Sequence, residues 1–355
     1  MGRVHHHKGR GAVSDRDGRF ETRPVVYDDE EAHERASKAP ETVLTAMRSG
    51  RIIATNGSPD IPFNRSINPY QGCEHGCIYC YARPSHSYLD LSPGLDFETR
   101  IFYKPNAAER LLAEWQRPSY ECEPITIGAN TDPYQPAEKT SRVTRSLLEH
   151  FHRYRHPVNL ITKSNLILRD LDLLADLARQ KLCSVAISVP TMDAPLKRIL
   201  EPRVPSAASR LDTVRQLSNA GIPTSVLVAP LIPAINDREI EAIVEASADA
   251  GANQAHYIFL RLPHEVKDLF TEWLDTHFPD RAAHVLSLVS QASGGKAYDS
   301  RFGVRQTGQG PYADILSKRF RNACRRFGLE RERYRDRLDC SLFERPGDKQ
   351  LGFGF

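Results

Sequence analysis

The amino-acid sequence predicts an α/β fold in which six βα units build a parallel sheet. Short runs rich in β-branched residues alternate with longer amphipathic stretches, which is the pattern of repeated βα units. A loop with three closely spaced cysteines follows the first predicted strand. In barrels of such units the loops after the strands converge on one mouth. The motif and the predicted fold therefore agree on where a functional site would lie.

The predicted strands are short, and the predicted helices have apolar residues three and four positions apart. Strands are expected at 66–68, 124–128, 158–162, 184–189, 224–229 and 255–260. The helices expected between them are 107–115, 143–154, 171–181, 207–220 and 237–250. Eight such units would close a complete barrel, and this chain has six.

The residues before the first unit predict an arm and a short helix. Residues 1–39 are polar, rich in Gly, Arg, Asp and Glu, and have no sustained period, which is typical of a mobile or surface-wrapping arm. For the histidines at 5–7 an exposed tail is favoured over a metal site. A helix is expected at 40–49, with Pro40 at its start and Gly50 after its end. The core is assigned to residues 40–290.

Residues 291–355 predict a basic, helical C-terminal extension. From Lys318 to Arg337 basic side chains are interleaved with aromatic ones, including Phe320, Phe327 and Tyr334. Arginines neutralise phosphates and aromatic rings stack on bases, so this mixture would suit a nucleic acid. Acidic residues dilute the positive charge, and a solvated helix face is the favoured interpretation.

Composition and charge narrow the classes of protein. Lys and Arg number 48 against 45 Asp and Glu, so the net charge of +3 does not indicate a nucleic-acid partner. The sequence has no run of 18 apolar residues and no apolar stretch of signal-peptide type, so we expect a cytoplasmic protein without membrane association. Seven cysteines in 355 residues lack the density of a secreted disulfide scaffold.

Cys73, Cys77 and Cys80 form a C-x3-C-x2-C loop, which offers a metal centre three ligands and withholds the fourth. A cluster of four irons held by three cysteines keeps one iron free for a ligand that is not protein. Structural zinc normally takes four protein ligands, and the other four cysteines stand far apart. His75 lies between two of the cysteines with too little chain to turn inward beside both. The loop therefore predicts a 4Fe-4S cluster.

With Tyr79 just before its third cysteine, this loop resembles the signature of the radical S-adenosylmethionine (SAM) superfamily. The resemblance implies a partial (βα)6 TIM-like barrel and a 4Fe-4S cluster whose open iron is chelated by SAM. It also implies the reaction: an electron donor such as flavodoxin or ferredoxin reduces the cluster, and SAM is cleaved to methionine and a 5'-deoxyadenosyl radical. This radical then abstracts hydrogen from a substrate.

Polar side chains at the ends of the predicted strands are the candidates for holding SAM. Thr131 and Asp132 are expected to hydrogen-bond its amino group, although their segment is also a routine turn. Lys163 is expected to neutralise its carboxylate, although such a lysine alone is more often solvated. Ser188, inside an apolar strand, needs a partner, either the backbone or the ribose of SAM. Arg203 either braces a turn or reaches the carboxylate.

The resemblance is more specific when these residues are taken in order. The cysteines, Tyr79, Tyr81, Thr131-Asp132, residues 162–164 and Ser188 look like the SAM-binding set of the spore photoproduct lyase branch, and on that likeness Tyr79 and Tyr81 are assigned as catalytic. The opening at residues 8–11 and the run at 68–77 are similar to those of uncharacterised bacterial photolyase-like radical SAM proteins.

One position departs from the spore photoproduct lyase pattern. In that branch a cysteine that returns a hydrogen atom precedes the pair matching Thr131-Asp132, and this chain has Asn130 there. An amide cannot donate a hydrogen atom as a thiol can. Cys122 is near in sequence but precedes its strand, so we expect it at the other end of the barrel. The departure argues against repair of a DNA photoproduct and leaves a nucleic-acid base, a peptide or a small metabolite as candidate substrates.

A second function is a nucleic-acid-binding protein with a structural iron-sulfur cluster, supported by the C-terminal arginines. The enzyme is favoured, because a purely structural cluster would ordinarily have four protein ligands. The two functions differ in whether SAM changes the spectrum of the cluster.

Overall fold

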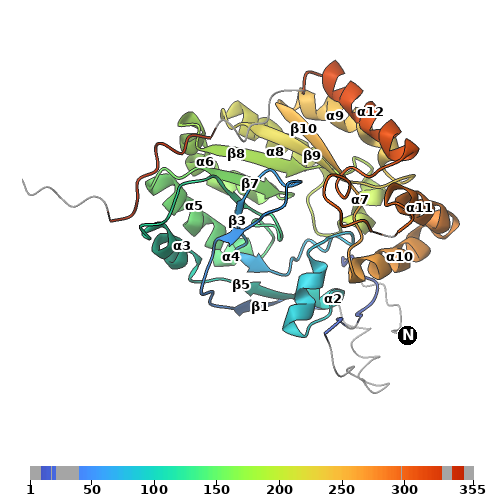
Figure 1. Ribbon diagram of the computed structural model, residues 1–355, viewed down its shortest axis with the longest axis horizontal. Coiled ribbons are helices and arrows are strands. Elements are labelled where there is room, and N and C mark those ends of the chain that lie inside the picture. Colours follow the sequence, from blue (N-terminus) through green and yellow to red (C-terminus); the bar gives the residue numbers. More distant parts are fainter. Residues whose placement is uncertain (1–8, 17, 21–39, 297, 330–337, 348–355) are drawn as a thin grey trace, which may run out of the picture.

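The structure is a computed structural model that describes residues 9–16, 18–20, 40–296, 298–329 and 338–347. Its larger sheet has the strand order β10-β9-β8-β7-β6-β3-β2 (Figure 1). The pairs from β3 to β10 are parallel, and β2 is antiparallel to β3. The strands are β2 (Ala54–Thr55), β3 (Arg65–Ile67), β6 (Ile125–Ile127), β7 (Val158–Thr162), β8 (Cys183–Ser188), β9 (Thr224–Leu231) and β10 (Gln254–Phe259). The six predicted strands are confirmed as the parallel part of this sheet.

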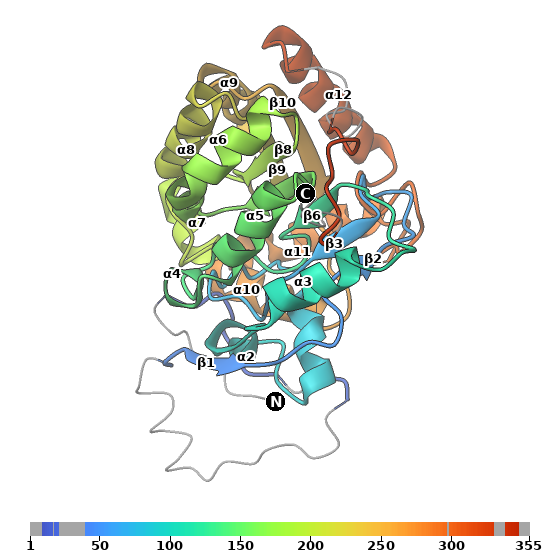
Figure 2. The ribbon, with the colours of Figure 1, turned by 90° about the vertical axis from the view of Figure 1, so that its left-hand side faces the viewer.

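Helices cover the outer side of the sheet, and one follows each of the first five parallel strands, as the spacing of the apolar residues predicts (Figure 2). They are α3 (Ala107–Trp115), α5 (Val143–Arg153), α6 (Leu171–Arg179), α8 (Ala207–Asn219) and α9 (Ile240–Asp249). Shorter helices stand in the connections: η1 (Arg83–Leu89), α2 (Leu95–Thr99), α4 (Glu138–Ser141), η2 (Asn165–Asp170), α7 (Ala194–Leu200) and η3 (Asp237–Glu239). The fold is the partial (βα)6 barrel that was expected.

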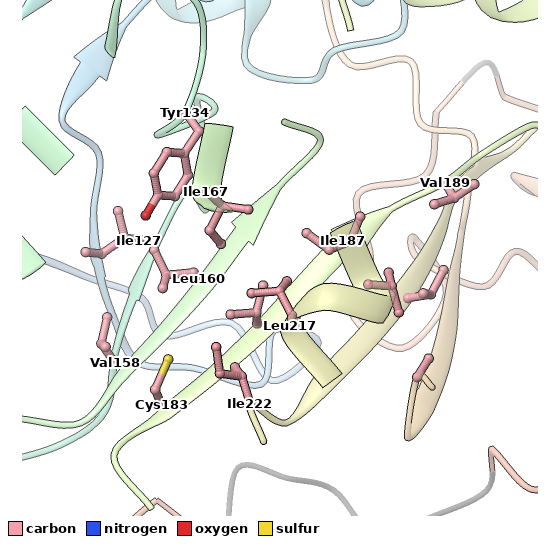
Figure 3. Close-up of a cluster of buried hydrophobic side chains, with 14 of the residues drawn as sticks. Ile127, Tyr134, Val158, Leu160, Ile167, Cys183, Ile187, Val189, Leu217 and Ile222 are labelled. Carbon is pink, nitrogen blue, oxygen red and sulfur yellow. The ribbon is translucent and has the colours of Figure 1, made fainter. Parts of the chain in front are cut away.

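The main core lies between the sheet and these helices. Leu160 of β7 and Ile187 of β8 are fully buried and join Leu217 of α8 and Ile222 in one cluster (Figure 3). Burial of each such side chain contributes about 1.5–3 kcal/mol. This packing fixes the strands, and with them the positions of the loops that follow their carboxyl ends.

The helix expected at 40–49 is wrong, because the structure has a strand, β1 (Val43–Ala46), in that segment. β1 pairs in parallel with β5 (Arg100–Tyr103), which is also antiparallel to β4 (Tyr70–Gln71). Val43 and Thr45 are β-branched and suit an extended chain. The pairing partner lies far along the sequence, so the capping signals of Pro40 and Gly50 were misleading.

The sequence left open a mobile or a surface-wrapping arm, and part of the arm is buried in the structure. Arg10, Ala12, Val13 and Ser14 are each less than 7% exposed. Polar composition did not reveal this, because partners such as Glu98 and Glu272 lie far along the sequence. The histidines at 5–7 lie outside the described residues.

The chain after β10 is helical and contains α10 (Glu265–His277), α11 (Pro279–Ala292) and α12 (Pro311–Arg326), with α12 packed on α9 (Figure 1). Of these helices, α12 lies wholly within the predicted extension, residues 291–355, whereas α10 and most of α11 fall among the residues assigned to the core. Phe320 of α12 is buried and its ring centroid lies 4.9 Å from that of Tyr257, so it packs in the core and is not available to stack on a base. Tyr334 lies outside the described residues. No helix in the described part of the chain is long and apolar enough to cross a membrane.

Candidate functional site

The cysteine loop follows β4 and is held in shape by its own backbone. Gly72 and Gly76 have φ angles of +80° and +67°, which favour glycine. The amide of Cys73 donates to the carbonyl of Phe97 at 2.9 Å, and the amide of Cys80 donates to the carbonyl of Cys77 at 3.2 Å. Cys73 and Cys77 are buried and Cys80 is half-buried. The loop thus presents its three thiols from a fixed backbone.

A single cavity brings the three thiols together with the carboxyl ends of the strands. Its wall from the cysteine loop consists of Cys73, His75, Cys77, Tyr79, Cys80 and Tyr81. The wall from the strands includes Asn130, Asp132, Thr162, Lys163, Ser188, Pro230 and Arg261. Eight of the ten residues predicted as ligands or catalytic residues therefore line one space, together with Asn130. Thr131 and Arg203 are the two exceptions.

Asp132 anchors the loop after β6 to the end of β7 and to the cysteine loop. Its Oδ1 accepts from the Thr162 hydroxyl at 2.6 Å, and its Oδ2 accepts from the Lys163 amide at 2.8 Å and lies 3.3 Å from Nδ1 of His75. Burial alone would raise the pKa of Asp132, but His75 and the two donors lower it to about 2. The carboxylate is therefore charged and largely occupied by protein donors.

Lys163 places a cation beside the cysteines. Its Nζ lies 5.9 Å from the ring centroid of Tyr79. Burial opposes the charge, yet Cys77, Glu201 and Asp132 together raise the pKa of Lys163 above its ordinary value. The ammonium group is thus present and available for a negatively charged partner in the cavity.

A buried ion pair that sequence reasoning missed supports the same wall. Glu201 and Arg210 are both fully buried, with Nη1 and Oε2 2.9 Å apart. The hydroxyl of Tyr79 donates to Glu201, whose Oε1 lies 4.0 Å from Sγ of Cys77. Arg210 also donates to the carbonyl of Ser188 at 2.9 Å. The pair links the cysteine loop to the end of β8, and only the tertiary fold reveals it, since Arg210 lies within α8.

A second missed residue, Glu98, lies beneath the loop and ties it to the N-terminal arm. Its carboxylate lies 2.5 Å from Nη2 of Arg83 and accepts from the amides of Gly11 at 3.0 Å and Ala12 at 2.8 Å. Arg83 in turn donates to the carbonyl of Cys77 at 3.0 Å. The arm is therefore part of the support of the cysteine loop.

Two predicted SAM contacts do not line the cavity among the described residues. Thr131 is buried and its hydroxyl donates to the carbonyl of Tyr70 at 2.8 Å. Arg203 lies 3.3 Å from Glu74 and braces the cysteine loop, which is the other interpretation that the sequence allowed. Tyr81 is 46% exposed and its hydroxyl donates to the carbonyl of Ala129, so it closes the rim of the cavity.

Comparison with known families decides the class of this site. The model of the radical SAM superfamily matches residues 67–246, which include the cysteine loop and the strand ends from β6 to β9. The chain belongs to the radical SAM superfamily. This confirms the resemblance drawn from the cysteine spacing.

The chain is also similar to two uncharacterised proteins and to a solved structure. An uncharacterised protein of Mycobacterium tuberculosis is 36% identical over 230 residues, which are 64% of this chain and 68% of that protein. An uncharacterised protein of Methanocaldococcus jannaschii is 27% identical over 214 residues, which are 60% of this chain and 76% of that protein. Spore photoproduct lyase complexed with dinucleoside spore photoproduct has a TM-score of 0.56 at 18% identity, covering 87% of this chain and 86% of that one. At this identity the likeness shows the shared fold.

The cysteine loop suits the iron-sulfur cluster that radical SAM membership implies. Burial, together with the negative charge of Glu201, raises the pKa of the Cys77 thiol to about 12. A thiolate at this position therefore needs cationic partners such as irons and Lys163. No three His, Cys, Asp or Glu side chains of the described residues are arranged to hold a single metal ion. A cluster bonds its cysteines through separate irons, so its ligands surround a space, as these three thiols do.

At the mouth of this radical SAM cavity Asn130 stands where a thiol would be needed to donate a hydrogen atom. Asn130 lines the cavity, and its backbone N–H donates to Oδ1 of Asn68 at 2.9 Å. Cys122 is not among the lining residues and contacts Cys340, which confirms that it lies elsewhere. Arg261, just after β10, lies over the rings of Tyr81 and Tyr298 at 5.5 and 5.6 Å.

Proposed function

We propose that the protein is an enzyme that holds a 4Fe-4S cluster through Cys73, Cys77 and Cys80 and binds SAM in the adjoining cavity. When bound, these groups supply the chemistry: one electron cleaves SAM to methionine and a 5'-deoxyadenosyl radical, which takes a hydrogen atom from the substrate. The observation that carries the proposal is that one cavity joins the three thiols of the cysteine loop to Asp132, Lys163 and Ser188. We infer a flavodoxin or ferredoxin as electron donor and a reducing, cytoplasmic setting.

The residues of the wall have distinct roles in this proposal. Lys163 supplies a fixed positive charge for the carboxylate of SAM and for the thiolates beside it. Asp132 orients the Lys163 backbone and the Thr162 hydroxyl, because most of its acceptor positions already serve these donors. Ser188 offers a hydroxyl at the end of β8, held in place by the bond from Arg210 to its carbonyl. Together they orient SAM and limit access of water.

The rim beyond the cysteines indicates where the substrate would bind. Nε of Arg261 is buried and has no hydrogen-bond partner among the described residues. A buried donor without a partner costs about 1–3 kcal/mol. A substrate with an acceptor oxygen beside Arg261 and Tyr81 would remove that cost. Asn130 at the same rim argues that a returned hydrogen atom, if the reaction needs one, comes from another group.

Spectroscopy of the reduced cluster tests the proposed function. SAM added to anaerobically reconstituted, dithionite-reduced protein should change the electron paramagnetic resonance signal of the cluster. Lys163→Ala should raise the SAM concentration that gives half of this signal change by about tenfold or more. A tenfold increase corresponds to a loss of about 1.4 kcal/mol of binding free energy. Lys267→Ala, on the exposed side of α10, is the matched control and should leave it unchanged. If the signal of a fully loaded cluster does not change when SAM is added, the cluster would instead be structural.

A further inference from the structure

Outside the cavity, two cysteines from distant parts of the chain meet. The side chains of Cys122, before β6, and Cys340, in the C-terminal segment, lie close enough for each to affect the pKa of the other thiol, and both residues are partly exposed. Neither lines the cavity, and neither belongs to the C-x3-C-x2-C motif. The radical SAM chemistry proposed above makes no use of them.

The backbone around Cys340 is held on both sides, so the contact of the two thiols is part of the fold. On one side the amide of Asp339 donates to the carbonyl of Lys181 at 3.0 Å. On the other side the amide of Glu344 donates to the carbonyl of Tyr154 at 2.9 Å. The C-terminal segment, residues 338–347, is therefore docked against the amino ends of the strands.

The segment also runs antiparallel to residues 118–122, in a matched series of contacts. Arg345 donates to the carbonyls of Pro118 at 3.4 Å and Tyr120 at 3.1 Å. The ring centroids of Phe343 and Tyr120 are 5.7 Å apart. The pair of Cys122 with Cys340 comes next in this order. Their sulfurs are thus brought together by flanking contacts on the same two stretches of chain.

We propose that Cys122 and Cys340 form a reversible disulfide that links the start of β6 to the C-terminal segment. The oxidant is a small disulfide such as oxidised glutathione. One thiolate attacks the glutathione disulfide and releases one glutathione. The second cysteine then displaces the other glutathione, so that two thiols are oxidised and one oxidised glutathione is reduced to two molecules of glutathione.

The surroundings predict how this pair reacts. Burial raises the pKa of both thiols, and Asp339 and Glu123 add to this effect for Cys340, whereas Arg65 opposes it for both. Because the thiolate is the attacking species, the reaction is expected to be slow at neutral pH and to accelerate as the pH rises. The resulting bond would clamp Phe343 against Trp115 and His156, whose ring centroids are 5.6 and 5.0 Å from that of Phe343.

Peptide mapping of the full-length, cluster-loaded protein tests the proposal. After anaerobic incubation with oxidised glutathione, free thiols are alkylated and the protein is digested without reduction. A linked pair of peptides containing Cys122 and Cys340 should appear with the loss of two hydrogen masses and should disappear with dithiothreitol. Cys183, which is fully buried, serves as the matched control and should stay a thiol.

Variants and stability supply the second measurement. Oxidation should raise the thermal midpoint of the native protein and leave that of Cys340→Ser or Cys122→Ser unchanged, because a disulfide restricts the unfolded chain. In either variant the remaining cysteine should carry at most a glutathione adduct. The proposal is overturned if both cysteines of the native protein stay alkylatable, carry only separate adducts, or pair with other cysteines. None of these results bears on SAM cleavage.

Discussion

Glu201 is the buried carboxylate on which the cavity wall depends. Both side chains of the pair between Glu201 and Arg210 are fully buried. Glu201→Gln removes the negative charge and therefore leaves the Arg210 guanidinium buried without a counter-ion. Breaking such a pair costs about 3–5 kcal/mol of unfolding free energy, measured by urea denaturation of the cluster-free protein. Asp212→Asn breaks the exposed pair with Arg215 and should cost less than about 1 kcal/mol. Equal losses in the two variants would contradict the role of Glu201.

His156 should make the stability of the protein depend on pH. Burial lowers its pKa from 6.5 to about 3, against an opposing hydrogen bond to the carbonyl of Pro157. Between about pH 3 and pH 6.5, His156 binds a proton in the unfolded chain but not in the folded chain. The unfolding free energy should therefore fall by about 1.4 kcal/mol per pH unit as the pH drops from 6.5 toward 3. His156→Gln should remove this part of the slope in denaturation curves, and an unchanged slope would refute the assignment.

Among the individual site residues, the sequence predicts those that stand in a motif or at the end of a predicted strand. Cys73, Cys77 and Cys80 are recognisable by spacing, and Lys163 and Ser188 by their places at strand ends. Glu98 and Glu201 escaped assignment as site residues, because their partners come from remote segments and no local pattern marks a buried ion pair. Such residues are found only once the fold brings their partners together.

The N-terminal arm and the cysteine loop form one structural unit. A side chain at Gly11 would place its Cβ 1.8 Å from the carbonyl oxygen of Gly76. Gly11→Ala should therefore displace the arm from the loop and speed the loss of iron from the reconstituted protein several-fold. Gly50→Ala, where a Cβ meets nothing within 4 Å, is the matched control. Equal rates of iron loss, followed by absorbance under a chelator, would show that the arm does not support the loop.

Among the elements, helices and parallel strands were predictable and the smaller sheet was not. The apolar period of α3 and α5 follows from a buried face against the sheet, so the sequence carries it. β1, β4 and β5 have two to four residues each and depend on pairing between distant segments. Their stability comes from neighbours and not from a local pattern.

At the scale of the whole molecule, segments outside the barrel pack against the cysteine loop at its mouth. The helices α10 and α11 pack with Ile78 and Tyr79 of the cysteine loop in a second apolar cluster, and Trp273 of α10 donates to the carbonyl of Ile199 at 3.0 Å. The fold class was predictable from the number of βα units together with the cysteine spacing. How the arm and the helices α10 and α11 pack against the cysteine loop was not, since it depends on contacts between segments far apart in the chain.

Formation of 5'-deoxyadenosine is the most direct test of the central claim. The anaerobically reconstituted protein is mixed with SAM and dithionite, and the products are separated by liquid chromatography. We expect 5'-deoxyadenosine and methionine in equal amounts, and none from Cys77→Ala, which should not load a cluster. A protein with a fully loaded cluster that forms no 5'-deoxyadenosine, even with candidate substrates present, would contradict the proposed cleavage of SAM.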